Sequence, residues 1–366
     1  MRTIRRLIYR EQLTAVGFVT LGFLALFFFF DFVDELSDVG KYGAMGYQLT
    51  HALLYVVLLV PSHLYELLPI TLLIGTIFVM ARFAQSSEYT ILRTSGLGPW
   101  RALRTLLSLG AAFVVLTFAV GDYIAPLTDR TAQLLKARYQ GRITIGQTGA
   151  WLKERQQDHS YAVNVASLTS SGDMQNLRIF EFDAANTLLS VTQAGSARFA
   201  AGAWELATVQ RTRYRTQDQQ ASIERQHLAN ERWPTGITYE MVTTALLKPD
   251  RMRTIDLFQY IQHLNANQQS AQRFEIEFWR KVFYPLSCLV MVVLALPFAY
   301  LHFRQGGIAG YVFGGVMAGI SFFLLNNVFG YVGNLQNWQP WLTAAAPGLI
   351  YSMVSLAAFG WLVLRR

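Results

Sequence analysis

Cysteine is almost absent from this sequence, and so are the short motifs of common catalytic sites. The single cysteine, Cys288, lies in an apolar run, which excludes a disulfide framework and a cysteine metal site. The six histidines stand apart at positions 51, 63, 159, 227, 263 and 302, and no H-E-x-x-H occurs. The one Gly-Lys pair, Gly40-Lys41, is followed by Tyr42 and is not part of a phosphate-binding P-loop. We therefore expect no catalytic residues, no metal site and no directly bound cofactor.

Charge is also scarce. Charged residues make up 15% of the chain and hydrophobic residues 52%, which is too apolar for a soluble protein with ordinary surfaces. The net charge of +8 could indicate a nucleic-acid partner, but the basic residues collect at the ends of apolar runs. This arrangement is typical of a membrane protein and argues against nucleic acid.

Six apolar runs are long enough to cross a bilayer as helices. The first, Leu13–Phe30, follows four arginines and has no small-x-small cleavage site after it, so we interpret it as a retained span rather than a signal peptide. The second, measured back about 20 residues from Arg82, begins near Ser62, which leaves His51–Val60 as an interfacial helix. The other four runs are Thr105–Ala125, Val282–Leu301, Gly307–Tyr331 and Trp341–Leu364.

Basic residues are distributed unevenly between the two sides of these spans. One side carries eleven of them, and the short loops of the other side carry only Lys41. The eleven are Arg2, Arg5, Arg6, Arg10, Arg82, Arg93, Arg101, Arg104, Arg304, Arg365 and Arg366. The positive-inside rule therefore predicts that this side and both termini are cytoplasmic.

The chain becomes polar between the third and fourth runs, where five stretches alternate with period two. They are Ser160–Leu168, Leu177–Phe182, Leu188–Phe199, Trp204–Tyr214 and Ala221–Leu228. Turn residues separate them, so we predict one inserted extracytoplasmic all-β domain, sandwich-like or jelly-roll-like. Its inward apolar positions would line either an ordinary closed core or an open groove. These positions are Tyr161, Val163, Val165, Leu168, Leu189, Val191, Ala197 and Phe199.

The predicted fold class is an α-helical membrane protein with six transmembrane helices and an inserted all-β, jelly-roll-like domain. Residues 1–126 hold the first three transmembrane helices, and residues 127–250 form the β domain. Residues 251–366 form a connecting helix, predicted over Pro249–Gln272, and the last three transmembrane helices.

A polar segment, Arg82–Arg104, separates the second and third runs. Within it, Ser86 and Ser87 can cap a helix, the helix dipole favours Glu88 in the first turn, and Gly96 ends it. One face of this helix would present Glu88, Ile91, Leu92 and Ser95. The segment near 86–96 is therefore either a docking helix or a solvated loop with one helical turn. A docking helix on a chain without a nucleotide site suits the membrane half of a pump whose energy enters from a partner ATPase.

Five pieces of the sequence, in order, carry a resemblance that covers essentially the whole chain. They are FVDEL at 32–36, YELLPI at 65–70, SSEYTILRTSG at 86–96, GDYIAP at 121–126 and FWRKVFYPLSCLVMVVLALPF at 278–298. The chain resembles the lipopolysaccharide-export permeases of the LptF/LptG family, and its pieces are nearer to the LptG branch. The resemblance implies a non-catalytic, multi-pass subunit of an ABC transporter that extracts lipopolysaccharide from the outer leaflet of the bacterial inner membrane for export to the outer membrane.

The resemblance also implies partners and site residues. The partners are an LptF-like permease subunit, an LptB-like ATPase dimer that uses the ATP, an LptC-like single-span protein and a periplasmic jelly-roll bridge. The residues that couple to the ATPase would be Ser87, Glu88, Ile91, Leu92, Ser95 and Gly96.

Lipopolysaccharide carries acyl chains and phosphates, so its site needs an apolar wall topped by cations. The candidates for the wall are Phe23, Phe27 and Phe30, at three- and four-residue steps on the first span. The candidate cations are Lys41, Arg130, Lys136 and Arg138. Where some relatives carry lysine near the end of the first span, this chain has Asp31, Ser37 and Asp38, with Lys41 as the substitute.

Two other functions are compatible with parts of the sequence. A membrane-anchored enzyme or sensor could act through the extracytoplasmic β domain, and it need not bring an ATPase with it on purification. A lipoprotein exporter is a closer alternative, but such permeases usually have four spans with the large domain after the first.

Overall fold

The computed structural model describes residues 2–86, 91, 94, 98–140, 149–156, 158–169, 172–200, 202–217, 220–238, 241–242, 249–300 and 308–361. The chain divides into two compact units. The helical unit consists of Met1–Glu35, Val56–Thr128 and Glu275–Arg366, and the second unit consists of Leu36–Tyr55 and Asp129–Phe274. The second unit contains the β domain.

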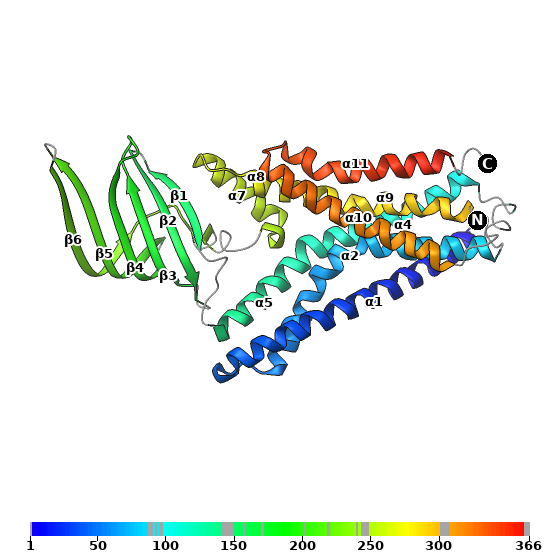
Figure 1. Ribbon diagram of the computed structural model, residues 1–366, viewed down its shortest axis with the longest axis horizontal. Helices are drawn as coiled ribbons and strands as arrows, with labels where there is room; N and C mark the ends of the chain where they lie inside the picture. Colours follow the sequence, from blue (N-terminus) through cyan, green and yellow to red (C-terminus); the bar gives the residue numbers. More distant parts are fainter. Residues whose placement is uncertain are drawn as a thin grey trace. The chain divides into compact units, whose positions relative to one another are not determined.

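Long helices make up the first unit, and six helical stretches among the described residues are long and apolar enough to cross a membrane (Figure 1). This confirms the prediction of six transmembrane helices with an inserted β domain. The helices are α1 (Arg2–Tyr42), α2 (Leu49–Gln85), α4 (Pro99–Ala119), α5 (Ala125–Gln140), α8 (Gln272–Phe283), α9 (Ser287–Ala295), α10 (Ile308–Leu335) and α11 (Pro340–Phe359). A π-helical turn, Val120–Ile124, joins α4 to α5, and a 3-10 turn, Tyr284–Leu286, joins α8 to α9.

Helix α2 differs from its predicted form. We expected an interfacial helix that ends at Pro61, but α2 runs without interruption from Leu49 to Gln85 with Pro61 and Pro69 inside it. Proline removes one backbone hydrogen bond from a helix and does not prevent its continuation when leaving the helix would expose more backbone to an apolar surrounding.

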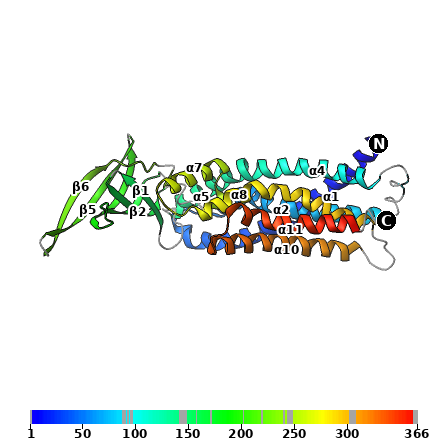
Figure 2. The same ribbon diagram turned by 90° about the horizontal axis from the view of Figure 1, so that it is seen from above.

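The centre of the helical unit is α2. Within the most apolar 18 residues of α2, 83% are buried in the chain, against 11% for α1. Helix α11 lies alongside both α9 and α10 (Figures 1 and 2), and α9 also contacts α4. Glycines allow close approaches between α2 and its neighbours: a Cβ added at Gly75 would lie 2.7 Å from Val16 Cγ2, and one at Gly315 would lie 2.7 Å from Ile77 Cδ1.

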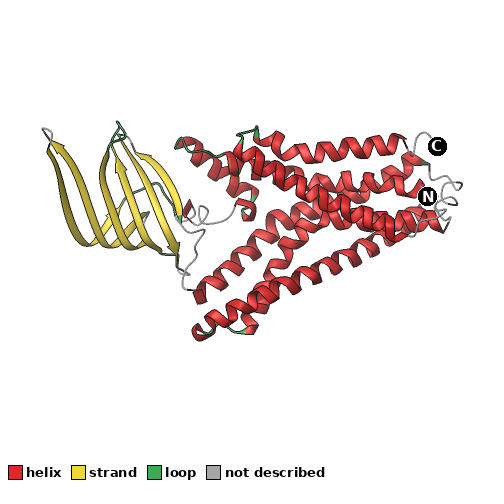
Figure 3. Cartoon of the chain, viewed as in Figure 1, coloured by secondary structure: helices red, strands yellow, loops and turns green. Residues whose placement is uncertain are grey.

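The described strands of the second unit form one antiparallel sheet in the order β1-β2-β3-β4-β5-β6 (Figure 3). They are β1 (Ala150–Gln156), β2 (His159–Leu168), β3 (Met174–Phe182), β4 (Leu188–Ala200), β5 (Ala203–Gln217) and β6 (Gln220–Trp233). Every strand pairs with its neighbours in sequence, so the connections are those of a meander. Five of these strands overlap the predicted stretches, and β1 was not predicted.

The alternation of buried and exposed side chains shifts by one residue in the middle of the strands, which we call a phase change. The pairing puts Asn176 of β3, Gly195 of β4 and Thr208 of β5 in one row, because the residues on either side of them pair in register. Asn176 and Thr208 have left-handed backbones, with φ of 50° and 55°. This conformation is unusual for residues other than glycine and interrupts the regular alternation of side chains. Residues three apart are therefore both buried, as in Ala194 and Ala197.

This phase change corrects part of the predicted inner face. On β4 the buried side chains before the row are Ser190, Thr192 and Ala194, so Leu189 and Val191 lie on the opposite face. Phe199 lies on the same face as the buried Ala197, and its ring lies 5.1 Å from that of the buried Trp204, but it is 36% exposed. On β2 the predicted positions Val163, Val165 and Leu168 are buried, and Tyr161 is partly buried.

The chain after β6 completes this core. Trp204 is fully buried, and its indole Nε1–H donates to the backbone carbonyl of Ile237 at 2.8 Å. Glu154 of β1 accepts hydrogen bonds from the backbone N–H of Gly236 at 2.6 Å and from the hydroxyl of Thr235. The core is therefore closed by buried apolar residues of this segment, including Ile237 and Val242.

Helix α7 (Thr254–Ala266) carries a histidine whose burial makes this unit sensitive to acid. Desolvation lowers the pKa of His263, so the folded chain favours the neutral ring. As the pH falls below about 6.5, His263 becomes protonated in the unfolded chain but stays mostly neutral in the folded chain. The free energy of unfolding of α7 therefore decreases. We expect amide exchange in α7, corrected for intrinsic rates, to rise between pH 7.5 and pH 5.5 in the full-length protein. His263→Gln should remove this rise, and an equal rise in the variant would contradict the assignment.

Candidate functional site

Three of the four predicted cations lie on α5, but they do not share a side of it. At 3.6 residues per turn, Arg130 and Arg138 fall on different sides of α5 from Lys136, and their side chains are exposed. Lys41 lies in the last turn of α1. The structure therefore brings Lys41 and Lys136 together and leaves Arg130 and Arg138 apart from them.

Asp38 is the residue that joins the two lysines. Its Oδ2 lies 2.6 Å from the Nζ of Lys136, and its Oδ1 lies 3.5 Å from the Nζ of Lys41. The Nζ of Lys136 also lies 4.7 Å from the centre of the Tyr55 ring, in a cation–π contact. The side chains of Asp38 and Lys136 are 19% and 23% exposed, whereas that of Lys41 is 65% exposed. Of the two lysines, Lys136 is held more firmly, and Lys41 is the more accessible to a ligand.

A histidine fixes the beginning of α2 against α5 beside this group. The backbone N–H of Gln48 donates to His51 Nδ1 at 3.1 Å, so the proton of the neutral ring is on Nε2. The Nε2–H then donates to the hydroxyl oxygen of Tyr139 at 2.8 Å. Tyr47, which is buried, packs against both rings. These contacts position the part of α5 that carries Lys136.

The predicted apolar wall lies on a helix that is joined to α2 at three levels. Among the described residues, polar pairs link Glu11 to Arg82 at 2.5 Å, Thr20 to Thr71 at 2.9 Å and Asp31 to His63 at 2.6 Å. The ring of Phe27 stacks on His63 with centroids 4.9 Å apart. Phe30 is exposed and Phe23 is partly buried. Phe27 is therefore packed against the Asp31–His63 pair, while the exposed Phe30 can face lipid or a ligand.

A second cluster of interest was not predicted. The side chain of Lys281 in α8 is 5% exposed, and its Nζ donates to the carbonyl of Gly121 at 3.1 Å. Gly121 belongs to the π-helical turn, where the backbone hydrogen bonds are shifted and a carbonyl becomes available. The ring of Tyr65 lies against the same glycine, and the Tyr284 hydroxyl donates to the carbonyl of Glu66 at 2.6 Å.

These contacts unite three of the sequence pieces on which the resemblance rests. Tyr65 and Glu66 belong to YELLPI, Gly121 to GDYIAP, and Lys281 to FWRKVFYPL. The pieces come from three different helical stretches, so each could be recognised in the sequence, but their meeting in space could not be predicted from it. The cluster joins α2, the end of α4 and α8.

Most of the predicted docking segment lies outside the described residues. This applies to Ser87, Glu88, Leu92, Ser95 and Gly96. Ile91 is described, and it is helical and exposed. The helix after the segment, α4, begins at Pro99. Trp100 is exposed, and its ring packs edge-to-face with that of Phe359, with ring centroids 5.9 Å apart.

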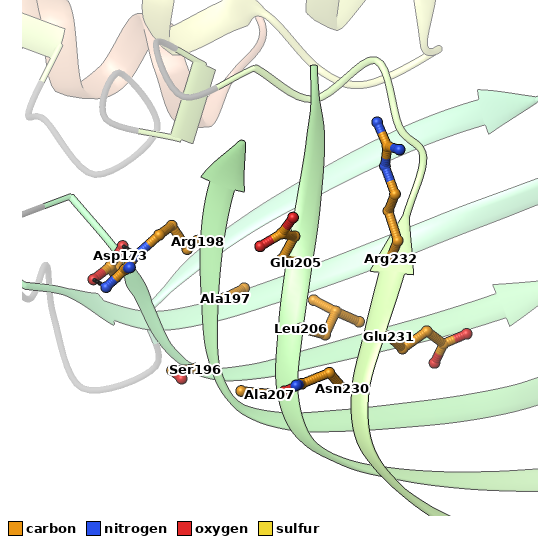
Figure 4. Close-up of a pocket in the computed structure, with 10 residues that line it drawn as sticks. All are labelled: Asp173, Ser196, Ala197, Arg198, Glu205, Leu206, Ala207, Asn230, Glu231 and Arg232. Atoms are coloured by element: carbon orange, nitrogen blue, oxygen red, sulfur yellow. Dashed lines mark hydrogen bonds and ion pairs between the residues drawn. The ribbon is translucent and has the colours of Figure 1, made fainter. Parts of the chain in front are cut away.

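A cavity of about 520 Å³ lies on the sheet of the second unit (Figure 4). Its lining is rich in charge of both signs, and in Figure 4 Asp173 and Arg198 lie beside each other at one end, joined at 3.2 and 3.3 Å. The lining residues are Asp173, Ser196, Ala197, Arg198, Glu205, Leu206, Ala207, Asn230, Glu231 and Arg232. A surface of this kind suits polar ligands and does not suit acyl chains.

Comparison with known proteins decides the family. Residues 6–365 match the family described as "Lipopolysaccharide export system permease LptF/LptG". The chain belongs to the LptF/LptG family. Its members are permeases, so the chain is a multi-pass membrane component of a transport system rather than a member of a catalytic family.

Two relatives within the LptF/LptG family have the same name. The chain is 27% identical to "Lipopolysaccharide export system permease protein LptG" of Escherichia coli strain K12 over 341 residues, which cover 92% of the chain and 90% of the relative. It is 25% identical to the LptG protein of Haemophilus influenzae over 370 residues, which cover 100% of the chain and 99% of the relative. The resemblance to the LptG branch is therefore confirmed over nearly the full length.

Proposed function

We propose that this chain is the LptG-type permease subunit of an ABC transporter that extracts lipopolysaccharide from the outer leaflet of the bacterial inner membrane. It passes the lipid to a periplasmic bridge for export to the outer membrane. The observation that carries the proposal is the family match over residues 6–365, which includes all six candidate spans and the β domain. The excess of arginine on one side of the spans supports cytoplasmic termini and a periplasmic β domain.

Energy for this function comes from a partner. The sequence contains no P-loop, so ATP is hydrolysed by a separate LptB-like ATPase dimer that the segment near 86–96 engages. Ser87, Glu88, Ile91, Leu92, Ser95 and Gly96 form the contact. An LptF-like subunit completes the membrane part, and an LptC-like single-span protein leads to the periplasmic jelly-roll bridge.

Helix α1 carries both kinds of residue that an acylated, phosphorylated lipid requires. Phe23, Phe27 and Phe30 supply apolar surface, and Lys41 supplies a cation in the last turn. Lys136 supplies a second cation beside Lys41, and Arg130 and Arg138 add positive charge elsewhere on α5. The phosphates are expected to contact Lys41 and Lys136 first, because two neighbouring ammonium groups can bind one phosphate together and Lys136 is partly desolvated, which strengthens its charge-assisted hydrogen bond.

Purification of the chain from its native membrane tests the proposal. The expected result is a complex that contains an ATPase and a second permease of the same family, both identified by mass spectrometry. Recovery of the chain without an ATPase, under conditions that preserve other ABC transporters of the same membrane, would favour an enzyme or sensor that works through its β domain.

Reversal of charge at Lys136 should weaken contact with lipopolysaccharide. Lys136→Glu puts a second carboxylate beside Asp38, and the yield of lipopolysaccharide adducts from a photocrosslinking residue at Gln133 should fall at least roughly tenfold. Arg138→Glu changes the charge by the same amount on a different side of α5 and should cause a smaller loss. Equal adduct yields from Lys136→Glu and Arg138→Glu would show that Lys136 does not contact the phosphates.

A further inference from the structure

Asp38 occupies the position that an anionic ligand of Lys41 and Lys136 would need. One of its oxygens is 2.6 Å from Lys136 and the other is 3.5 Å from Lys41. We propose that Asp38 is an internal anion that holds this lysine pair while the lipid site is empty, and that a ligand must displace it in order to bind. The proposal rests on the proposed function, because it assigns a role to Asp38 in the selection of the transported lipid.

The geometry suits an anion that is held but replaceable. Lys136 cannot easily follow a departing carboxylate, because its ammonium also lies over the ring of Tyr55. Lys41 is exposed and near the end of α1, so its long side chain can turn toward a new ligand. Asp38 is on the same helix as Lys41, three residues earlier, and a change of its side-chain rotamer is enough to release both lysines.

The charges of the group determine which ligands can compete with Asp38. Two lysines and one aspartate leave a net charge of +1 at the site. A phosphodiester lipid headgroup brings one negative charge, the same as the carboxylate that it would replace, so the exchange gains little. A phosphomonoester carries about −1.5 to −2 near neutral pH and three acceptor oxygens, which can engage both lysines at once.

Asp38 is therefore expected to act as a specificity-determining residue. It disfavours lipids with a single phosphodiester charge, which are abundant competitors in a membrane, and admits lipids that carry phosphomonoesters on an acylated sugar. Specificity gained by a repulsive or competing group is distinct from specificity gained by added attraction. The same carboxylate can re-form the pair when the lipid leaves, which favours release.

Asp38→Asn in the intact permease–ATPase complex tests this role. In nanodiscs, the variant should bind bisphosphorylated lipid A about five- to tenfold more tightly, because a site that is mostly closed by its own ion pair becomes open. It should gain at least as much affinity for phosphatidylglycerol, so the preference for lipid A over phosphatidylglycerol should not rise and is expected to fall. Asp38→Glu keeps the charge and should retain the wild-type preference.

Asp34→Asn is the matched control. Asp34 is an exposed carboxylate one helical turn earlier on α1, and its replacement removes the same charge. The affinity of Asp34→Asn for both lipids should remain within twofold of the wild type. In the double variant Asp38→Asn, Lys136→Gln, the gain from Asp38→Asn should disappear.

The possible outcomes separate this proposal from the function on which it rests. If the wild-type complex fails to bind lipid A, the proposed function is wrong. If the wild type binds lipid A and Asp38→Asn binds it no more tightly, or Asp34→Asn shows an equal gain, the role of Asp38 is overturned. Asp38→Ser gives the same charge removal with a smaller side chain, and it replaces Asp38→Asn should that variant fail to assemble with the ATPase.

Discussion

Glu88→Ala is expected to separate the permease from its ATPase. In the proposed function Glu88 begins the docking segment and meets basic residues of the partner, and truncation of one member of a partly buried charge pair costs about 2–5 kcal/mol. At the affinities of stable complexes this is a loss of roughly 30-fold or more in binding. The amount of ATPase that co-purifies per permease should fall by at least that factor at limiting concentration, and transport of lipopolysaccharide should stop.

Ser86→Ala is a suitable control for this variant. Ser86 is the first residue of the segment near 86–96 but is not one of the six proposed contact residues. It is exposed, and its hydroxyl donates to the carbonyl of Arg82, one helical turn earlier. Its replacement should leave ATPase binding unchanged. If Glu88→Ala retains full ATPase association and transport, the assignment of residues 86–96 to coupling fails.

Gly121→Ala is expected to have the largest effect on stability. A Cβ at this position would lie 2.3 Å from two atoms of the Tyr65 ring, far inside van der Waals contact. Either the ring or the π-helical turn must move, and the carbonyl that accepts the Lys281 ammonium moves with it. Overpacking of this kind costs about 1–3 kcal/mol, and loss of a charged hydrogen bond to a buried group adds about 1.5–3 kcal/mol.

The thermal unfolding midpoint of the purified complex measures this effect. Gly121→Ala should lower the midpoint by several degrees. In the double variant with Tyr65→Ala, the loss should be smaller than the sum of the two single losses, because the ring that the added methyl would meet is absent. Gly310→Ala is the matched control, because no described atom lies within 4 Å of a Cβ added to that helical glycine. A midpoint for Gly121→Ala equal to that of Gly310→Ala would contradict the packing described around Tyr65.

The sequence was sufficient to predict the spans and most strands because each depends on a local pattern. Run length and the absence of charge define a transmembrane helix, and period two defines a strand. Two elements could not be predicted from local patterns. Strand β1, AWLKERQ, carries charges at three of its seven positions and does not look apolar on either face. Helix α2 continues through Pro61 because of its apolar surroundings, which a local rule for proline does not consider.

Residues of the candidate site could be named from the sequence, but their relations could not. That Lys41 and Lys136 meet at Asp38 depends on the packing of α1 against α5, which no spacing in the sequence encodes. Period two also failed to place Leu189 and Val191, because the left-handed residues Asn176 and Thr208 on neighbouring strands change the phase of β4. Alternation in one strand gives no sign of an irregularity that is shared across three.

The most direct test of the proposed function is transfer of lipopolysaccharide by the purified complex. The chain, its partner permease, the ATPase and the LptC-like protein are reconstituted in liposomes that contain lipopolysaccharide, and a soluble jelly-roll acceptor carries a photocrosslinking residue. The expected result is acceptor–lipopolysaccharide adducts that accumulate only with ATP and that disappear when Glu88→Ala replaces the wild-type chain. A complex that hydrolyses ATP at the same rate with and without lipopolysaccharide, and gives no adducts, would contradict the proposal that this chain extracts lipopolysaccharide.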